Sequence, residues 1–307
     1  PHMERIPQHG RLLGLALLAA LSACGDQPAT TTNAAEPGLV IGDDTPTAAT
    51  SLYQMPTPNE LFGLVREMAG EGQKRMMNPA SNVDRYATLA SRAVNFGVYS
   101  TDLIYASSFD LNVEVVRYYL TVKKLGDELG LTAAFSEKDF SRLESNLAHG
   151  DSLEIISNDA YYKAYEKLQD ENMGATLALV LSGGWVESMH LVVRQVDKYT
   201  ANDPLIARIA DQKVTLEHLV DMLEPHAQDK DVAPVRDELI ALRALYDALP
   251  VTRKPHEGKS ASGRMVLGDD VHVDMSEANY TAISQAVEAL RERLTRTDDQ
   301  SAGATKA

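Results

Sequence analysis

Polar residues recur at helical spacing within two segments that are otherwise apolar. In the first segment they lie at i, i+4 and i+7, and they are Asn95, Tyr99 and Asp102. In the second segment the stripe begins at Gly183 and continues at i+4, i+7 and i+11 with the polar residues Glu187, His190 and Arg194. Residues three or four apart share one face of a helix, so each set predicts a polar stripe. A carboxylate buried without a partner costs several kcal/mol, so we expect the two stripes to converge.

Two interpretations of these stripes stay open. In the first, the polar side chains form a satisfied hydrogen-bond network that fixes how two central helices dock. In the second, Asp102, Glu187 and His190 line a cleft, where carboxylates and an imidazole with separated pKa values could perform acid–base catalysis or bind a ligand. An open pocket around these side chains would favour the second interpretation, and burial among helices would favour the first.

The second segment also contains Ser182-Gly183-Gly184-Trp185, although a glycine inside a helix costs about 1 kcal/mol relative to alanine. Close approach of another helix, or a kink, would explain the glycines, and a ligand stacked on Trp185 is the alternative. The spacing Glu187-x-x-His190 resembles the metal-binding pairs of ferritin-like di-iron bundles, but the second pair that such sites require is missing. Because the common hydrolase, phosphate-loop and dinucleotide motifs are also missing, we expect neither a metal nor a cofactor.

The single cysteine, Cys24, lies in a context typical of lipid modification. An apolar run over 12–21 is too short to cross a bilayer about 30 Å thick, and it follows a short positive stretch. The next residues, Leu21-Ser22-Ala23-Cys24, resemble the lipobox of bacterial lipoproteins, in which the cysteine is acylated and the chain is cut just before it. We predict a signal peptide over 1–23 and lipidation of Cys24; an ordinary secretory signal or an apolar helix of a globular fold are the alternatives.

Lipidation of Cys24 predicts a membrane-anchored protein of the cell envelope. Gly25, where an aspartate would favour retention at the inner membrane, is compatible with an outer-membrane anchor facing the periplasm or the cell surface. The formal net charge of −15 argues against nucleic-acid binding, and it would repel an anionic membrane, so the lipid must provide the anchoring. Tyrosine outnumbers phenylalanine 12 to 5, which suits helix rims or a groove for a glycan, a peptide or another envelope protein.

The rest of the chain predicts an all-α fold, an antiparallel multi-helix bundle of about nine helices. Residues 24–51 contain few large apolar side chains, and we expect them to form a flexible tether. We expect the helical domain at 52–295 and a disordered tail at 296–307. Residues such as Ser81, Asp203 and Ser276 are expected to cap helix starts, and Gly130 and Gly150 to follow helix ends. A small β-hairpin is expected at 265–273, with its turn at Gly268-Asp269-Asp270. The helices are expected at 57–69, 81–108, 111–129, 136–149, 151–171, 173–199, 204–224, 232–249 and 276–295.

Five stretches carry a resemblance to a family of uncharacterised, mostly helical lipoproteins from Bacteroidetes-type bacteria. They are Met55-Pro56-Thr57-Pro58-Asn59-Glu60, Met77-Asn78-Pro79, Asn95-Phe96-Gly97-Val98-Tyr99-Ser100-Thr101-Asp102-Leu103, Lys123-Lys124-Leu125-Gly126-Asp127-Glu128-Leu129-Gly130 and Gly183-Gly184-Trp185-Val186-Glu187-Ser188. The resemblance covers about residues 53–225 and implies a helical fold and a lipid anchor, without an activity. The family pattern has an aromatic residue at the position of His190, which argues against a catalytic role for this histidine.

Overall fold

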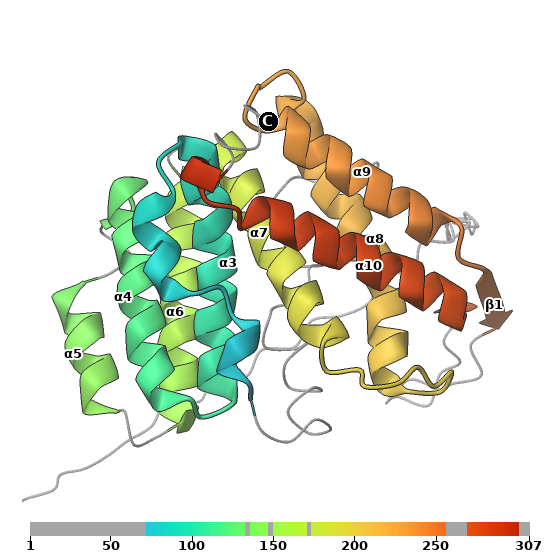
Figure 1. The fold of residues 1–307 in the computed structure, drawn as a ribbon, viewed down its shortest axis with the longest axis horizontal. Helices are drawn as coiled ribbons and strands as arrows, with labels where there is room; N and C mark the ends of the chain where they lie inside the picture. The colour runs from blue at the N-terminus through green and yellow to red at the C-terminus, as the bar shows by residue number, and fades with distance from the viewer. Residues whose placement is uncertain (1–71, 133–135, 147–149, 171–172, 256–268, 301–307) are drawn as a thin grey trace, which may run out of the picture. The chain divides into compact units, whose positions relative to one another are not determined.

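Helices make up most of the chain in the computed structural model, which describes residues 72–300 except 133–135, 147–149, 171–172 and 256–268 (Figure 1). All these residues belong to one compact unit spanning Pro46–Ala307. The predicted signal peptide, Cys24, the tether and the helix at 57–69 lie outside the described residues. The all-α prediction is confirmed, because each of the other eight predicted helices has a counterpart.

The described elements follow one another along the chain, with short 3-10 helices labelled η. They are η1 (Lys74–Met76), η2 (Ala80–Arg85), α3 (Leu89–Ser108), α4 (Asn112–Glu128), α5 (Glu137–Ser145), α6 (Gly150–Asp170), α7 (Gly174–Val193), α8 (Pro204–Leu223), η4 (Glu224–His226), α9 (Ala233–Asp247), β1 (Val251–Pro255), β2 (Asp269–Val273) and α10 (Glu277–Leu294).

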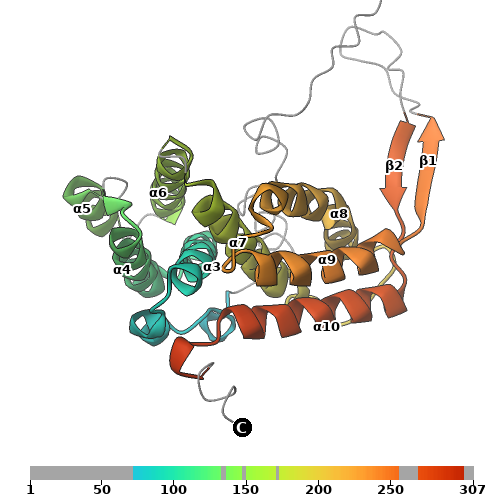
Figure 2. The same cartoon turned by 90° about the horizontal axis from the view of Figure 1, so that it is seen from above.

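Helices α3 and α7 form the centre of the fold. They share the most extensive contact between any two described elements, and α4 and α6 flank α3 while α8 and α10 flank α7 (Figure 2). Glycines allow the two backbones to approach: a Cβ on Gly97 would lie 1.9 Å from the Val180 carbonyl oxygen, and one on Gly183 would lie 2.0 Å from that of Val94. The glycines therefore serve close helix approach, as one of the two interpretations predicted.

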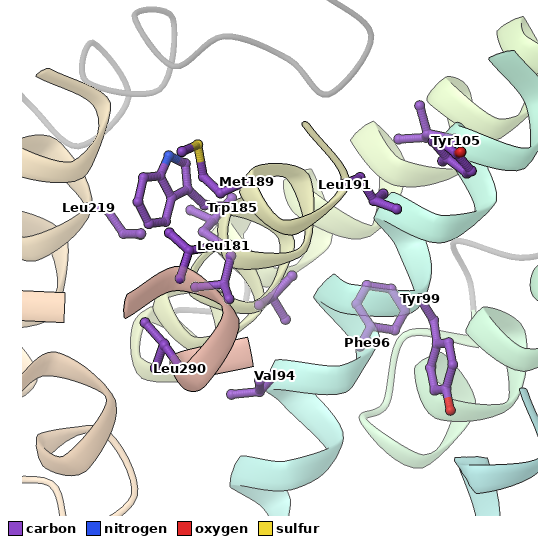
Figure 3. Close-up of a cluster of buried hydrophobic side chains, with 14 of the residues drawn as sticks. Val94, Phe96, Tyr99, Tyr105, Leu181, Trp185, Met189, Leu191, Leu219 and Leu290 are labelled. Atoms are coloured by element: carbon purple, nitrogen blue, oxygen red, sulfur yellow. The ribbon is translucent and has the colours of Figure 1, made fainter. Parts of the chain in front are cut away.

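The all-round apolar character of α3 and α7 reflects their burial on nearly every side. Figure 3 shows part of this core, with Leu181 and Trp185 of α7 close to residues of other helices. Helix α7 is the one helix among the described residues that is long and apolar enough to cross a membrane, but 94% of that stretch is buried within the protein. Its apolar composition is therefore explained by its central position.

Side-chain caps start several helices, although not all where the sequence predicted them. Asp203 accepts a hydrogen bond from the Leu205 N–H at 2.8 Å, and Ser276 caps α10 through the Asn279 N–H, so both predictions are confirmed. Ser81 does not cap the central helix: it lies within η2, and Thr88 caps α3 through the Ser91 N–H. The expected helix 81–108 is thus two elements.

The two predicted C-terminal glycines behave differently. Gly130 has a φ of +82° and follows α4, where the Gly130 and Leu131 N–H groups bond the Asp127 and Gly126 carbonyls in a Schellman motif. Gly150 is instead the first residue of α6, so its predicted role as a terminator is wrong.

The small sheet is antiparallel, as expected, but its strands are farther apart in sequence. Strand β1 pairs with β2 in a register that places Val251 opposite Val273 and Pro255 opposite Asp269. Asp269 and Asp270 therefore lie in a strand, and the predicted turn at these residues is wrong. The strand that pairs with β2 is β1, which begins shortly after α9 and therefore lies outside the predicted range 265–273.

The chain beyond α10 differs from the expected disordered tail at 297–300. Thr297 is fully buried, and a carboxylate oxygen of Asp298 accepts hydrogen bonds from the backbone N–H groups of Ala87 and Thr88 at 2.7 and 3.0 Å. Asp299 pairs with Arg85 at 2.7 Å. The helical domain therefore extends past residue 295, because Asp298 bonds backbone groups just before α3 and Asp299 pairs with the end of η2.

Candidate functional site

The two polar stripes converge, as predicted, but they meet on a third segment, residues 73–79, which includes η1 and precedes η2. Nε2 of His190 lies 3.0 Å from the Met76 carbonyl oxygen, and Nη2 of Arg291 lies 3.4 Å from the same atom. The Asp102 carboxyl group accepts a hydrogen bond from the Asn78 N–H at 3.0 Å. Side chains of α3, α7 and α10 thus bind the backbone of a segment that forms little regular structure.

Three tyrosines complete this arrangement. Tyr118 donates to the Asn78 carbonyl at 2.7 Å, Tyr99 donates to the Pro79 carbonyl at 2.9 Å, and the Tyr105 hydroxyl accepts from the Gln73 N–H at 2.9 Å. Burial raises the pKa of each hydroxyl, so all three stay protonated. We call the residues that bond this backbone the clamp; they are Tyr99, Asp102, Tyr105, Tyr118, His190 and Arg291.

Glu187 does not bond the backbone of residues 73–79 itself but binds Arg291, a residue of the clamp. Its carboxylate binds Arg291 in a bidentate pair, at 2.9 Å to Nε and 3.0 Å to Nη2. Burial disfavours the charge of Arg291, but the adjacent Glu187 charge outweighs it and raises the pKa of the guanidinium above its usual value. The pair balances its own charge, which a fully buried carboxylate such as Glu187 requires.

Asp102 has a different electrostatic environment from Glu187. Burial, and then the negative charge of Glu187, raise the pKa of Asp102 well above its usual value, and Arg291 only partly opposes them. One carboxyl oxygen of Asp102 accepts from the Asn78 N–H, and a side-chain hydrogen bond with Glu187 also contributes to the raised pKa. The neutral acid is therefore favoured over an extended pH range, and it leaves no unbalanced charge in the core.

His190 and Arg194 of α7 both bind Glu288 of α10. Nδ1 of His190 lies 2.7 Å from Oε1, and Arg194 contacts Oε2 at 2.7 and 3.1 Å. Burial raises the pKa of Glu288, but the hydrogen bonds from these two residues lower it to about 2. Both ring nitrogens of His190 therefore lie within hydrogen-bond distance of an oxygen atom, Nδ1 facing Glu288 and Nε2 facing the Met76 carbonyl.

The remaining predicted residues divide between the clamp region and the core. Asn95 accepts from the Asn78 amide at 3.3 Å and donates to the Leu294 carbonyl at 3.0 Å, so it links the segment to the end of α10. Trp185 lies away from the stripes: it packs near Leu219 of α8, and its Nε1 donates to Gln212 at 3.1 Å (Figure 3). Including Trp185 in the candidate polar site was therefore wrong.

Several residues that complete the site were not predicted from the sequence. Asn78 was noted only within a resembling stretch, and Tyr118 was not singled out. Arg291 and Glu288 carried a usable signal, because they are polar residues three apart beside the apolar positions Val287 and Leu290 of their helix. A buried Glu187 required a cation, and a search for basic residues at the border of an apolar stripe would have selected Arg291.

The site is sealed rather than open. Asp102 and Glu187 are 0% exposed and His190 is 4% exposed, and each of these side chains is hydrogen-bonded to other residues of the chain. Within the described ranges no group of three or more His, Cys, Asp or Glu residues could hold a metal ion. The arrangement stabilises a buried backbone, since polar backbone groups removed from water need partners.

No protein-family model, no curated protein and no solved structure matches this chain.

Proposed function

We propose that this protein is a lipid-anchored protein of the cell envelope, whose helical domain binds or scaffolds a partner. The observation that carries the anchor is the sequence before Cys24, in which an apolar run of ten residues is followed by Leu-Ser-Ala-Cys. The resemblance to helical envelope lipoproteins agrees with this. An anchor of two or more acyl chains would hold the domain stably on a membrane, where one chain would be marginal.

The burial of the polar stripes supports binding or scaffolding over the alternative, an envelope enzyme that uses Asp102, Glu187 and His190. A general acid or base must come within about 3 Å of a substrate atom. Each of these side chains is instead buried and held by the chain itself. The contacts of the clamp explain why these three polar side chains lie in the interior.

Metabolic labelling with an alkyne-bearing fatty acid tests the anchor. The full chain, expressed in a Gram-negative host, is expected to carry the label and to sediment with membranes, whereas Cys24→Ala is expected to carry none. A chain that stays unlabelled and is released in the aqueous fraction would contradict the proposal.

Separation of inner and outer membranes tests the location. The unchanged chain is expected in the outer-membrane fraction, and Gly25→Asp, which keeps the lipidated cysteine, is expected to shift to the inner membrane. Equal labelling of the two chains controls for lipidation. Recovery of the unchanged chain in the inner membrane would contradict an outer-membrane anchor while leaving lipidation intact.

A further inference from the structure

A pocket of about 430 Å³ lies where residues 74–81 meet the first two turns of α4. Its volume is within the range of small-molecule sites. Met77, Pro79 and Tyr118 contribute to the lining, together with four charged residues, Lys74, Arg75, Glu114 and Arg117. We call it the basic pocket, because three of these four are cations.

The positive charge of the basic pocket exceeds what its carboxylate neutralises. Glu114 is buried, with 8% of its side chain exposed, and it binds Lys74 at 3.2 Å and Arg117 at 2.8 Å. Arg75 bonds an uncharged group, the Gln73 side-chain oxygen, at 2.9 Å from Nε. Two positive charges therefore remain in one pocket of a chain whose formal net charge is −15.

The arginines of the pocket also retain hydrogen-bond donors. Among the residues that the structure describes, both terminal nitrogens of Arg75 lack a hydrogen-bond partner, and Arg117 uses only Nη1. Arginine presents its donors as a planar fork that matches phosphate and carboxylate oxygens in pairs. An excess of two positive charges matches a phosphate monoester, which carries a charge of about −1.5 to −2 at pH 7.

The backbone that carries Lys74 and Arg75 is held in place before any ligand arrives. The clamp bonds the backbone groups of Gln73, Met76, Asn78 and Pro79. Pro79 lines the pocket, and the other three are neighbours in sequence of Lys74, Arg75 and Met77, which also line it. Glu114 likewise orients Lys74 and Arg117 from below the surface. A site with ordered walls loses less conformational entropy on binding.

We propose that the basic pocket binds the phosphate group of a small phosphorylated ligand, through Arg75, Arg117 and Lys74. This inference goes beyond the lipid anchor, and it holds or fails independently of Cys24.

Calorimetric titration of the full chain in non-ionic detergent tests the pocket, with inorganic phosphate and glycerol phosphate as the probes. At an ionic strength of about 0.01 M screening is weak, and saturable binding is expected. Arg75→Gln is expected to weaken it about tenfold or more, because charge-assisted hydrogen bonds are lost. Arg208→Gln is the matched control: it makes the same change at an exposed arginine of α8 outside the pocket, and it should leave the affinity unchanged.

Vesicle sedimentation identifies the source of the phosphate group. For this test Cys24→Ala replaces the lipidated residue, and vesicles with phosphatidic acid are compared with vesicles of phosphatidylcholine alone. Binding of the soluble probes indicates a free phosphorylated compound, whereas binding only to phosphatidic acid vesicles indicates a lipid headgroup. Either result supports the pocket if Arg75→Gln weakens the binding and Arg208→Gln does not. Absence of binding to every probe, or equal losses in Arg75→Gln and Arg208→Gln, would overturn the proposal.

Discussion

Residues 73–79 are contacted by the clamp and also line the basic pocket, and the two regions use charge in opposite ways. In the clamp, Arg291 is mostly buried and holds a fully buried Glu187 through two hydrogen bonds. In the basic pocket, Arg117 and Lys74 have more than half of their side chains exposed, and they share one carboxylate. The raised pKa values of Asp102 and Arg291 belong to the clamp and accompany a structural role, while the cations available to a ligand lie at the surface.

The largest expected effect comes from uncoupling the buried ion pair of the clamp. Arg291→Met leaves Glu187 buried without a cation, and it should lower the free energy of unfolding by about 3–5 kcal/mol. Arg293→Met is the control on the same helix, because that arginine pairs with Glu238 at the surface and should lose about 0–1 kcal/mol. Urea denaturation measures both values, and equal losses would contradict the structural role of the clamp.

The next largest effect should come from the glycines that bring α3 and α7 together. Gly97→Ala places a Cβ against the Val180 carbonyl oxygen, so the helices that carry the clamp must separate, at a cost of about 3 kcal/mol. Gly184→Ala adds the same methyl group in ordinary contact, 3.4 Å from Thr101 Oγ1, and the helix propensity of alanine should make it neutral or stabilising by up to about 1 kcal/mol. Thermal unfolding that ranks the two variants in the opposite order would show that α3 and α7 do not pack in this register.

The sequence predicted the helices better than the segment that they surround. Apolar spacing and capping residues locate α8 and α10 within a residue or two, because both signals are local. The same logic extended α3 back to Ser81, since the sequence between Ser81 and Thr88 offers no glycine or proline to interrupt a helix. The interruption comes instead from tertiary contacts, including the Tyr86 hydroxyl bonded to the Thr295 carbonyl at 2.8 Å.

The candidate site was predictable in part for the same reason. Helical spacing within α3 and within α7 identified Asp102, Glu187 and His190, and the cost of burying a carboxylate predicted that the stripes meet. What they bind could not be read from spacing, because residues 73–79 lack a periodic pattern and reach the clamp through backbone atoms. Trp185 was misplaced because it is adjacent in sequence to the polar stripe but projects towards α8.

The charge state of Asp102 gives a pH-dependent test of the clamp. Its pKa in the folded protein is raised, so the folded state binds the proton more tightly, and the stability from this group is lost as pH rises above about 4 towards the folded pKa. The loss approaches about 1.4 kcal/mol per pH unit. Asp102→Asn keeps an oxygen for the Asn78 N–H but does not titrate.

Chemical denaturation from pH 4 to 8 compares the two chains. The stability of the variant, relative to that of the unchanged chain, should increase with pH. A constant difference across this range would show that Asp102 keeps its ordinary pKa and carries a charge in the core.

Tyr118 belongs to both regions and gives the smallest and most selective effect. Its hydroxyl donates to the Asn78 carbonyl in the clamp, while the residue also lines the basic pocket. Tyr118→Phe removes the hydroxyl alone, which should cost about 1 kcal/mol of stability and should weaken phosphate binding less than Arg75→Gln does, because the cations of the pocket stay in place. Arg75→Gln should do the reverse, losing phosphate affinity at a stability cost within about 0.5 kcal/mol, as for other surface substitutions. Denaturation measures the stability of both variants and titration measures their affinity. An equal loss of affinity in the two variants would mean that the clamp and the pocket are one energetic unit rather than two.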